Sequence, residues 1–331
     1  MLSFKDLVVD VATLGPVMPL ADSKPVVTPD PFADAIEHWR FGVSSASRIG
    51  LVHGLPLRRG IAPTALTNGT GFVSTPTVTL TGSGAEGLTG FAEISAANSV
   101  QAAGISGQPA DDTTAPTATI TGGGGSGAAV TYGRGAEPGY TTKSAVLAAG
   151  RINGLISSID DAAVYSEAYL IKRPASGVTQ HIGGTMLSVG RSRGVAVGGD
   201  LLQWYSSGGV DSLRWLNASG TSGSTIVLAI PASWTPGTWG VLIVSQGVAS
   251  RTAIAFGPDA TSTKVTGAQA KTVANPTRKR AIGGLHYDTG SDYGSNEIAS
   301  FANWASALSE TVMGNYANDL LDYARDAALI S

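Results

Sequence analysis

The segment that most constrains the fold of this chain lies near the C-terminus, where a strand pattern runs directly into a helix pattern. The side chains of the strand alternate between one face, with Ile298, Ser300, Ala302 and Trp304, and another, with Ala299, Phe301 and Asn303. This period of two predicts a β-strand that is at least partly covered on both faces, as in a two-sheet sandwich. Ser309 then provides a helix cap, and Glu310 places a negative charge in the first turn, where the helix dipole favours it.

The composition favours an all-β fold over a helical enzyme. Of 331 residues, 44 are glycine and 16 are proline. Charged residues make up only 14%, against roughly 25% in ordinary soluble domains. Such a chain is expected to bury much of its surface in an assembly. A net charge of −3 gives no electrostatic footprint for nucleic acid, and the lack of cysteine excludes disulfides and thiolate metal sites.

From residue 141 onward, short apolar runs alternate with turn residues. Many short strands at this spacing predict a sandwich or a jelly roll. The expected strands are Ala145–Ala149, Ala163–Ile171, Gly184–Val189, Gly194–Val197, Leu201–Tyr205, Ser212–Leu216, Thr225–Ile230, Gly240–Val244, Thr252–Phe256 and Arg280–Tyr287.

A helix is expected over the C-terminal residues 309–331. Its apolar residues follow helical spacing and include Met313, Tyr316, Ala317, Leu320, Leu321, Ala324, Ala327 and Ala328. This apolar face packs either on the chain's own sandwich, which we favour, or against a sister subunit.

Residues 63–140 carry a repeated pattern. Pro76 and Pro116 each begin a P-T-x-T-x-T-G strand that runs into glycine. Alternating threonine and apolar residues favour a strand exposed on one face, and the glycines supply turns that need positive φ. We expect a small Gly-rich β-insertion at one edge of the sandwich. The alternative is a flexible Gly/Ser linker.

The first 35 residues are predicted to form an extended arm that gains order by lying on a neighbour, with a disordered tail as the alternative. Five prolines would break a helix there and keep any strand short (Pro16, Pro19, Pro25, Pro29 and Pro31). The apolar run Leu7–Leu20 contains Asp10 and two of these prolines, which argues against a cleaved signal peptide. No apolar run reaches the ~18 residues of a membrane helix.

Several short motifs resemble the concanavalin A-like jelly rolls, the laminin-G-like lectin superfamily. They are the corner W-x-x-A-L-S at Trp304–Ser309, the alternation of Trp39 and Phe41, the Tyr140–Leu147 segment, and the strand in Trp234–Val244. The first and last strands of that family lie side by side. The resemblance therefore implies that residues 38–42 pair antiparallel with residues 298–304. The domain would then be discontinuous, made of residues 36–62 and 141–308.

Catalysis is not expected. Sandwich hydrolases need two carboxylates on one strand face, and the usual E-x-D-x-E strand is missing. Asp160 and Asp161 are adjacent and would point to opposite faces of a strand. The four histidines have no partners at metal-ligand spacing. The G-x-S-x-G match at Gly190–Gly194 is better explained as a hairpin turn than as a nucleophile elbow.

The candidate binding residues are aromatic or oxygen-bearing. Sugars stack on aromatic rings, and candidate rings near loop–strand junctions are Trp204, Tyr205, Trp215, Tyr287 and Tyr293, whereas Trp39, Trp239 and Trp304 are expected in the core. One oxygen-rich loop could hold Ca²⁺ through Asp288, Asp292, Asn296 and Glu297, with a simple polar turn as the favoured alternative. The basic run Arg278–Arg280 is either a patch for phosphate or an acidic glycan, or a solvated loop end, which we favour.

The Gly-rich repeats resemble those of bacteriophage tail and fibre proteins. This resemblance implies a non-enzymatic virion structural protein, such as a tail fibre, spike or head decoration, with recognition of host surface glycans as a second role. It would be assembled in the bacterial cytoplasm as a homo-oligomer with other virion proteins, without nucleic acid or membrane insertion. The alternative is an extracellular, lectin-like carbohydrate-binding module of bacteria. A polysaccharide lyase or hydrolase would lack its carboxylate pair.

Overall fold

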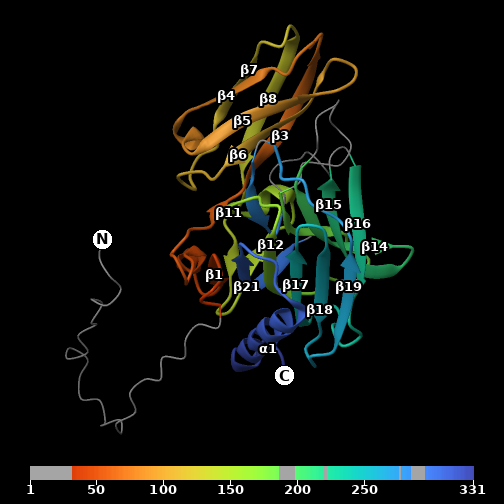
Figure 1. The fold of residues 1–331 in the computed structure, drawn as a ribbon. Helices are drawn as coiled ribbons and strands as arrows, with labels where there is room; N and C mark the ends of the chain where they lie inside the picture. Colours follow the sequence, from red (N-terminus) through yellow and green to blue (C-terminus); the bar gives the residue numbers. More distant parts are fainter. Residues whose placement is uncertain (1–31, 186–197, 220–221, 276, 285–294) are drawn as a thin grey trace, which may run out of the picture. The chain divides into compact units, whose positions relative to one another are not determined.

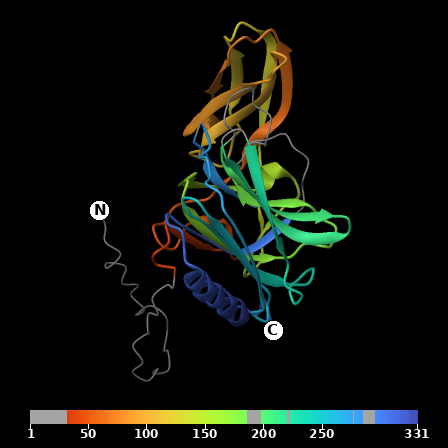
Figure 2. The same cartoon turned by 45° about the vertical axis from the view of Figure 1, so that its right-hand side comes forward.

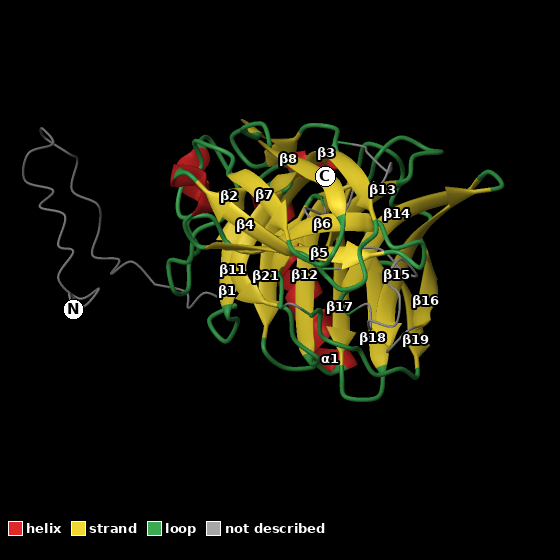
Figure 3. Ribbon diagram, turned by 90° about the horizontal axis from the view of Figure 1, so that it is seen from above, coloured by secondary structure: helices red, strands yellow, loops and turns green. Residues whose placement is uncertain are grey.

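The computed structural model describes residues 32–185, 198–219, 222–275, 277–284 and 295–331. These residues fold almost entirely into antiparallel β-structure, as Figures 1 and 3 show. The predicted all-β, sandwich-like fold class is confirmed. Three short 3-10 helices interrupt the strands, at Ser45–Arg48, Ser83–Ala85 and Arg151–Asn153.

Two large sheets form the sandwich. Sheet A has eight strands in the order β19-β18-β17-β12-β21-β10-β9, with β1 also paired to β21. Its strands are β1 (Glu37–Arg40), β9 (Gly139–Tyr140), β10 (Ala145–Leu147), β12 (Tyr165–Lys172), β17 (Trp239–Gln246), β18 (Arg251–Phe256), β19 (Ser262–Gly267) and β21 (Asn296–Trp304).

Sheet B has seven strands in the order β16-β15-β14-β13-β20-β11-β2. They are β2 (Arg58–Arg59), β11 (Leu155–Asp160), β13 (Gln180–Gly184), β14 (Asp200–Ser207), β15 (Val210–Ser219), β16 (Ser222–Ala229) and β20 (Lys279–Ile282). Strand β19 was not expected from the sequence. Its residues are mostly polar, and every second side chain along it is exposed. The strand expected at 194–197 and most of the one expected at 184–189 lie outside the described residues.

The first and last strands of the sandwich lie side by side, as predicted. Strand β1 pairs antiparallel with β21, from Glu37 opposite Asn303 to Arg40 opposite Ser300. This pairing joins segments that lie at least 260 positions apart in the sequence. The side chains of His38 and Ser300, 262 residues apart, also meet there, with 2.8 Å between the Nε2 and Oγ atoms. The chain between them therefore leaves the sheet and returns to it.

Strand β21 is covered on both faces, but its faces divide differently from the predicted alternation. Ile298 packs with Phe301 in the core between the sheets, whereas Ala299 packs with Ala302 and Trp304 on the outer side of sheet A. The register with β12 shifts at this point, so that Ile171 pairs with Ile298 while Leu170 pairs with Ser300. Such a bulge adds one residue to a strand and resets which face each side chain takes.

Helix α1 (Glu310–Asp326) covers the outer face of sheet A. Figure 2 shows it running beside that sheet. Ser309 caps it as predicted, since its side chain accepts a hydrogen bond from the backbone N–H of Val312. The favoured packing on the chain's own sandwich is therefore observed. The helix ends earlier than the apolar pattern suggested: Ala328 lies beyond it, exposed and with φ of 56°.

Residues just before β1 belong to the same layer. Phe32 is fully buried and stacks on Tyr316 of α1, with ring centroids 5.0 Å apart. Asp34 accepts hydrogen bonds from the Tyr316 hydroxyl and the Trp304 indole. The end of the predicted arm is thus fixed by aromatic packing, and residues 1–31 lie outside the described part of the chain.

The insertion consists of three nested antiparallel pairs. Strand β3 pairs with β8, β4 with β7, and β5 with β6. Their bounds are β3 (Ile61–Thr70), β4 (Thr77–Thr81), β5 (Leu88–Ile94), β6 (Val100–Gly107), β7 (Thr117–Thr121) and β8 (Ser126–Arg134). The pairs enclose an apolar core that includes Phe72, Val78, Val100, Ile105 and Val130.

The two sequence repeats pair with each other instead of stacking as an array. Thr77 lies opposite Thr121 and Val78 opposite Ile120, so the threonines share an exposed face. The glycines that follow the second repeat take positive φ, for example 78° at Gly122 and 71° at Gly123. This is the turn function that their spacing predicted, and the segment is folded structure, not a flexible linker.

Candidate functional site

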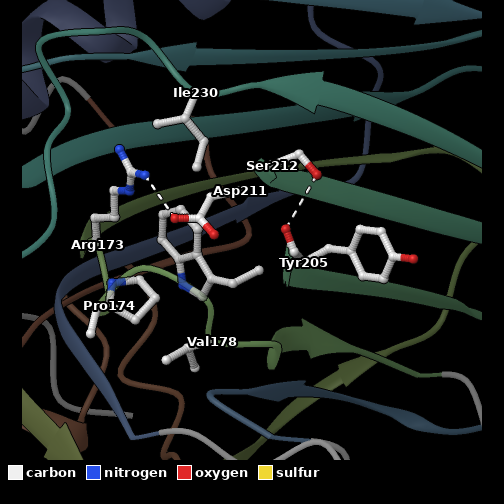
Figure 4. Close-up of a pocket in the computed structure, with 9 residues that line it drawn as sticks. Arg173, Pro174, Val178, Tyr205, Asp211, Ser212 and Ile230 are labelled. Atoms are coloured by element: carbon white, nitrogen blue, oxygen red, sulfur yellow. Dashed lines mark hydrogen bonds and ion pairs between the residues drawn. The ribbon is translucent and has the colours of Figure 1, made fainter. Parts of the chain in front are cut away.

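A small hollow opens at the rim of the sandwich, where the connection from β12 to β13 meets β14, β15 and the end of β16. Its enclosed space is about 10 Å³, which is room for roughly one water molecule. It is lined by Arg173, Pro174, Ala175, Val178, Trp204, Tyr205, Asp211, Ser212 and Ile230 (Figure 4). Its walls are apolar and partly buried, and a few polar groups lie among them, which is the usual composition of a small-ligand site.

A tight hairpin positions two sides of the hollow. Gly208 and Gly209 connect β14 to β15 with φ of 59° and 80°. Positive φ at both central residues is what a two-residue type I′ turn requires, and glycine provides it without strain. The turn sets Tyr205 opposite Ser212 in the register, and the Ser212 hydroxyl donates to the Tyr205 carbonyl at 3.3 Å.

Asp211 is the acidic group of the hollow and is held ionised. Its carboxylate accepts the Gly177 N–H at 3.0 Å and lies 3.1 Å from a guanidinium nitrogen of Arg173. The Gly177 hydrogen bond lowers the pKa of Asp211 below its usual value, and Arg173 adds to the effect. Figure 4 shows the Arg173–Asp211 pair, and Arg173 also donates to the Trp234 carbonyl in the connection between β16 and β17.

Trp204 contributes an unused hydrogen-bond donor. Its ring is 1% exposed and packs edge-on against Trp234, with centroids 5.2 Å apart. Its indole Nε1 is buried and has no hydrogen-bond partner in the part of the chain that the structure describes. Buried donors in native structures are almost always paired, so an unpaired one beside a hollow marks a position where a ligand or water atom would be favoured.

Tyr205 faces the outside of sheet B next to the hollow. Figure 4 shows its ring directed away from Pro174 and Val178. The ring is partly exposed, and the Arg214 guanidinium lies 4.2 Å from its centroid. Of the aromatic residues predicted to contact sugars, this is the one within the described part of the chain whose ring reaches the surface.

The other predicted aromatic platforms lie elsewhere. Trp204 and Trp215 are each 1% exposed and belong to the core between the sheets, so their faces contact protein instead of solvent. On a strand, alternate residues point inward, and both indoles occupy inward positions. Tyr287 and Tyr293 lie outside the described residues. The core positions predicted for Trp39, Trp239 and Trp304 are confirmed.

The predicted calcium ligands are only partly described. Asp288 and Asp292 lie outside the described residues. Asn296 is buried and bound to Gln180 and to backbone carbonyls, and Glu297 pairs with Lys172 at 2.9 Å. Within the described ranges no cluster of three or more metal-ligating side chains occurs. The calcium site therefore stays a prediction.

A cluster of buried charges lies between the two sheets, and sequence reasoning missed it. Arg280 on β20 contacts Glu167 on β12 at 2.6 and 2.7 Å and Asp200 on β14 at 2.7 and 3.0 Å. Lys271 contacts Asp200 at 3.3 Å and also pairs with Asp161. Burial opposes ionisation of Asp200, but Arg280 and Lys271 outweigh it and hold the pKa of Asp200 well below its usual range.

This cluster corrects the interpretation of the basic run. Arg278 and Arg280 are each 1% exposed, so the expectation of a solvated loop end is wrong for both. They alternate with Lys279, which points outward and pairs with the exposed Asp160 at 2.8 Å. Asp160 and Asp161 lie on opposite sides, as predicted, because Asp161 is buried in the cluster.

The buried carboxylates are structural by their geometry. Glu167 and Asp200 are both bound by the same guanidinium and each is about 1% exposed. Their remaining acceptor positions are taken by Tyr169, Thr185 and Tyr165. A substrate therefore cannot reach them without opening the sandwich, and the hollow is the better candidate for a site.

Comparison with protein-family models gives no match, and neither does comparison with curated proteins. Among solved structures, the CBM40 of the Ruminococcus gnavus IT-sialidase bound to α2,3-sialyllactose is similar at a TM-score of 0.39 and 12% identity, over 53% of this chain and 96% of that one. The ligand-binding domain of botulinum neurotoxin serotype D, in complex with N-acetylneuraminic acid, has a TM-score of 0.37 and 10% identity, over 54% of this chain and 42% of that one.

A third structure, the K499G mutant of the NanB sialidase from Streptococcus pneumoniae, has a TM-score of 0.35 and 12% identity over 46% of this chain and 24% of that one. These likenesses are distant. Of the helices in the described residues, none has the length and hydropathy needed to cross a membrane.

Proposed function

We propose that this protein is a non-catalytic carbohydrate-binding module and that the rim hollow receives a hydroxyl group of a sugar bound across it. The observation that carries the proposal is the buried indole N–H of Trp204, which has no partner among the described residues and belongs to a side chain that lines the same apolar-walled hollow as the ionised Asp211. A sugar ring presents C–H faces and hydroxyl groups together, so it needs apolar contact and both hydrogen-bond donors and acceptors. The hollow supplies all three.

Each lining group has a role in this proposal. Pro174, Val178 and Ile230 provide apolar contact for a C–H face. The Trp204 N–H donates to a hydroxyl oxygen and the Asp211 carboxylate accepts from a hydroxyl. Because Asp211 is fixed by Gly177 and Arg173, little side-chain freedom is lost on binding.

The test is retention of the full chain on immobilised bacterial surface polysaccharides and on α2,3-sialyllactose, with calcium and with chelator. Asp211→Asn and Trp204→Phe are expected to weaken binding about two- to tenfold, the size of a single hydrogen bond. The matched controls are Asp322→Asn on α1 and Trp239→Phe, a buried indole on the outer side of sheet A that does not line the hollow. Equal losses in variants and controls, or no retention by the unaltered protein, would exclude the site.

Calcium is tested by the same experiment. Loss of retention with chelator would support the predicted loop of Asp288, Asp292, Asn296 and Glu297 as a metal site. Retention that is independent of chelator would mean that binding at the hollow needs no calcium.

A role as a virion structural protein is a second proposal. It is supported by the insertion, in which the two P-T-x-T-x-T-G repeats pair into a rigid, threonine-faced subdomain that a sugar site does not need. The protein would then be located in the virion as a homo-oligomer. If it has no virion role, the proposed location is extracellular, as for the carbohydrate-binding module. Mass spectrometry of purified phage particles and light scattering of the purified chain test it, and a monomer absent from particles would exclude it.

A further inference from the structure

The outer face of β14 and β15 continues from the hollow and carries three polar side chains, and two of them have buried polar atoms without a hydrogen-bond partner among the described residues. Leu202, Trp204, Leu213 and Trp215 point into the core. Alternation along the strands therefore places Gln203, Tyr205 and Arg214 on the opposite, outer face. In the register Gln203 lies directly opposite Arg214, and Tyr205 lies one step along. We call these three residues the Arg214 face.

Arg214 is a cation that the structure leaves without an anion. Within the described residues its guanidinium makes no ion pair, and its Nε atom is buried without a hydrogen-bond partner. Its plane lies over the Tyr205 ring at 4.2 Å. Stacking holds an arginine in position while leaving its N–H groups free. Val227, its neighbour on β16, is 53% exposed, so this part of the face is open.

Gln203 adds a second, independent observation. It is fully buried, yet neither its amide oxygen nor its amide nitrogen has a hydrogen-bond partner. A glutamine in that state destabilises the fold, and an apolar residue would fit the position at lower cost. The amide lies across the ladder from the unpaired guanidinium, so the unused groups are concentrated at one place.

We propose that the Arg214 face binds the carboxylate of an acidic saccharide. This rests on the proposed carbohydrate function and narrows it to sugars that carry an anionic group. The guanidinium is suited to a two-pronged contact with a carboxylate. The guanidinium stays stacked on Tyr205 and presents its outer N–H groups to the carboxylate, and Gln203 lies directly across the ladder from it. Tyr205, which contributes to both the hollow and the Arg214 face, connects the two parts of the site.

The test uses probe pairs that differ in charge: α2,3-sialyllactose against lactose, and polygalacturonate against its methyl ester. Each is titrated against the full chain at low and high sodium chloride. We expect the acidic member of at least one pair to bind more tightly and to weaken with salt, since screening acts on exposed charges. Arg214→Gln should reduce acidic binding by at least about tenfold and leave neutral binding unchanged.

A second variant tests the Arg214 face with an anion that belongs to the protein itself. Gln203→Glu places a carboxylate opposite Arg214, and this built-in anion should block acidic ligands even though the arginine is present. Arg325→Gln, on α1 and already paired with Asp322, is the matched control. Thermal unfolding checks that each variant is folded.

The outcomes separate the two proposals. If the unaltered protein binds neither member of either pair, and no polysaccharide of the larger panel, the carbohydrate function itself fails. If it binds neutral and acidic members equally, or if Arg214→Gln and Gln203→Glu leave acidic binding unchanged, the carbohydrate function stands and the acidic specificity is overturned.

Discussion

In the insertion, three nested strand pairs enclose an apolar interior, whereas the sandwich interior combines an apolar core with a cluster of charges from distant strands. The insertion core is made of residues such as Val100, Ile105 and Val130. The sandwich buries Arg280 with Glu167, a partner 113 residues away, and with Asp200, 80 residues away. The two regions therefore depend on different forces.

This difference shows how each region responds to a single change. An apolar core loses stability in proportion to the cavity left by a removed side chain. A buried ion cluster fails when one member is removed, because the remaining charges stay in a medium that solvates them poorly. All six tryptophans lie outside residues 61–134, so indole fluorescence reports the sandwich alone.

The largest effect is expected from Arg280→Met. The substitution leaves Glu167 and Asp200 without their shared cation, and the sandwich should lose about 3–5 kcal/mol of unfolding free energy. Urea unfolding followed by tryptophan fluorescence measures this, with Arg325→Met on the surface as the control. A loss no greater than that of the control would show that the cluster is not needed for stability.

Ile105→Ala should lower the stability of the insertion and leave the stability of the sandwich unchanged. Ile105 is fully buried, and its truncation should cost about 2–5 kcal/mol. Hydrogen exchange across residues 61–134 is expected to accelerate while the fluorescence transition keeps its midpoint. Thr119→Ala, on the exposed face of β7, is the control. A matching shift of the fluorescence midpoint would mean that the two regions unfold together.

Acid should distinguish the regions further. The pKa of Asp200 is lowered in the folded protein, against about 3.9 when unfolded. The unfolded chain therefore takes up the proton first, and the stability that ionised Asp200 supplies is present above about pH 4 and is lost as pH falls below it. The effect should be smaller than that of Arg280→Met, because protonation removes a charge without removing the guanidinium that both carboxyl groups contact.

Unfolding free energies between neutral pH and pH 3 test this, with Asp200→Asn as the comparison. The variant should be less stable at neutral pH and lose less stability on acidification. Equal acid slopes for both proteins would contradict the assignment.

The smallest effect is expected at the cap of α1, which belongs to the sandwich side of the comparison. Ser309→Ala removes the acceptor for the Val312 N–H and should cost about 1 kcal/mol. Ser309→Asp keeps an acceptor and should restore the stability. Thermal unfolding of the three proteins is sufficient, and an alanine variant as stable as the aspartate variant would show that the cap contributes nothing.

Local patterns determined much of the fold. The period of two predicted the strands, Ser309 and Glu310 predicted the start of α1, and the glycines after the second repeat predicted turns with positive φ. These features depend on a few neighbouring residues and their backbone preferences, which are written directly in the sequence. The pairing of β1 with β21 followed from the resemblance to a known sandwich family and is present in the structure.

The site could be predicted only in part. Trp204 and Tyr205 are adjacent, and the sequence marks both as aromatic residues near a turn. Strand alternation sends one ring inward and the other outward, but which one faces the core depends on the register of β14 between β13 and β15. Likewise, no local signal shows that Arg214 has no ion-pair partner within the described residues, because that requires knowing where the carboxylates around it lie.

The sequence by itself determined that this is a chain of short strands with a capped helix and a folded Gly-rich insertion. Only the tertiary structure decided that Arg280 is fully buried and Lys279 is only partly buried, although the two are adjacent and both basic. The physical reason is that burying a charge is favourable only where partners converge on it. For Arg280 those partners are Glu167 and Asp200, which the fold brings from two other strands.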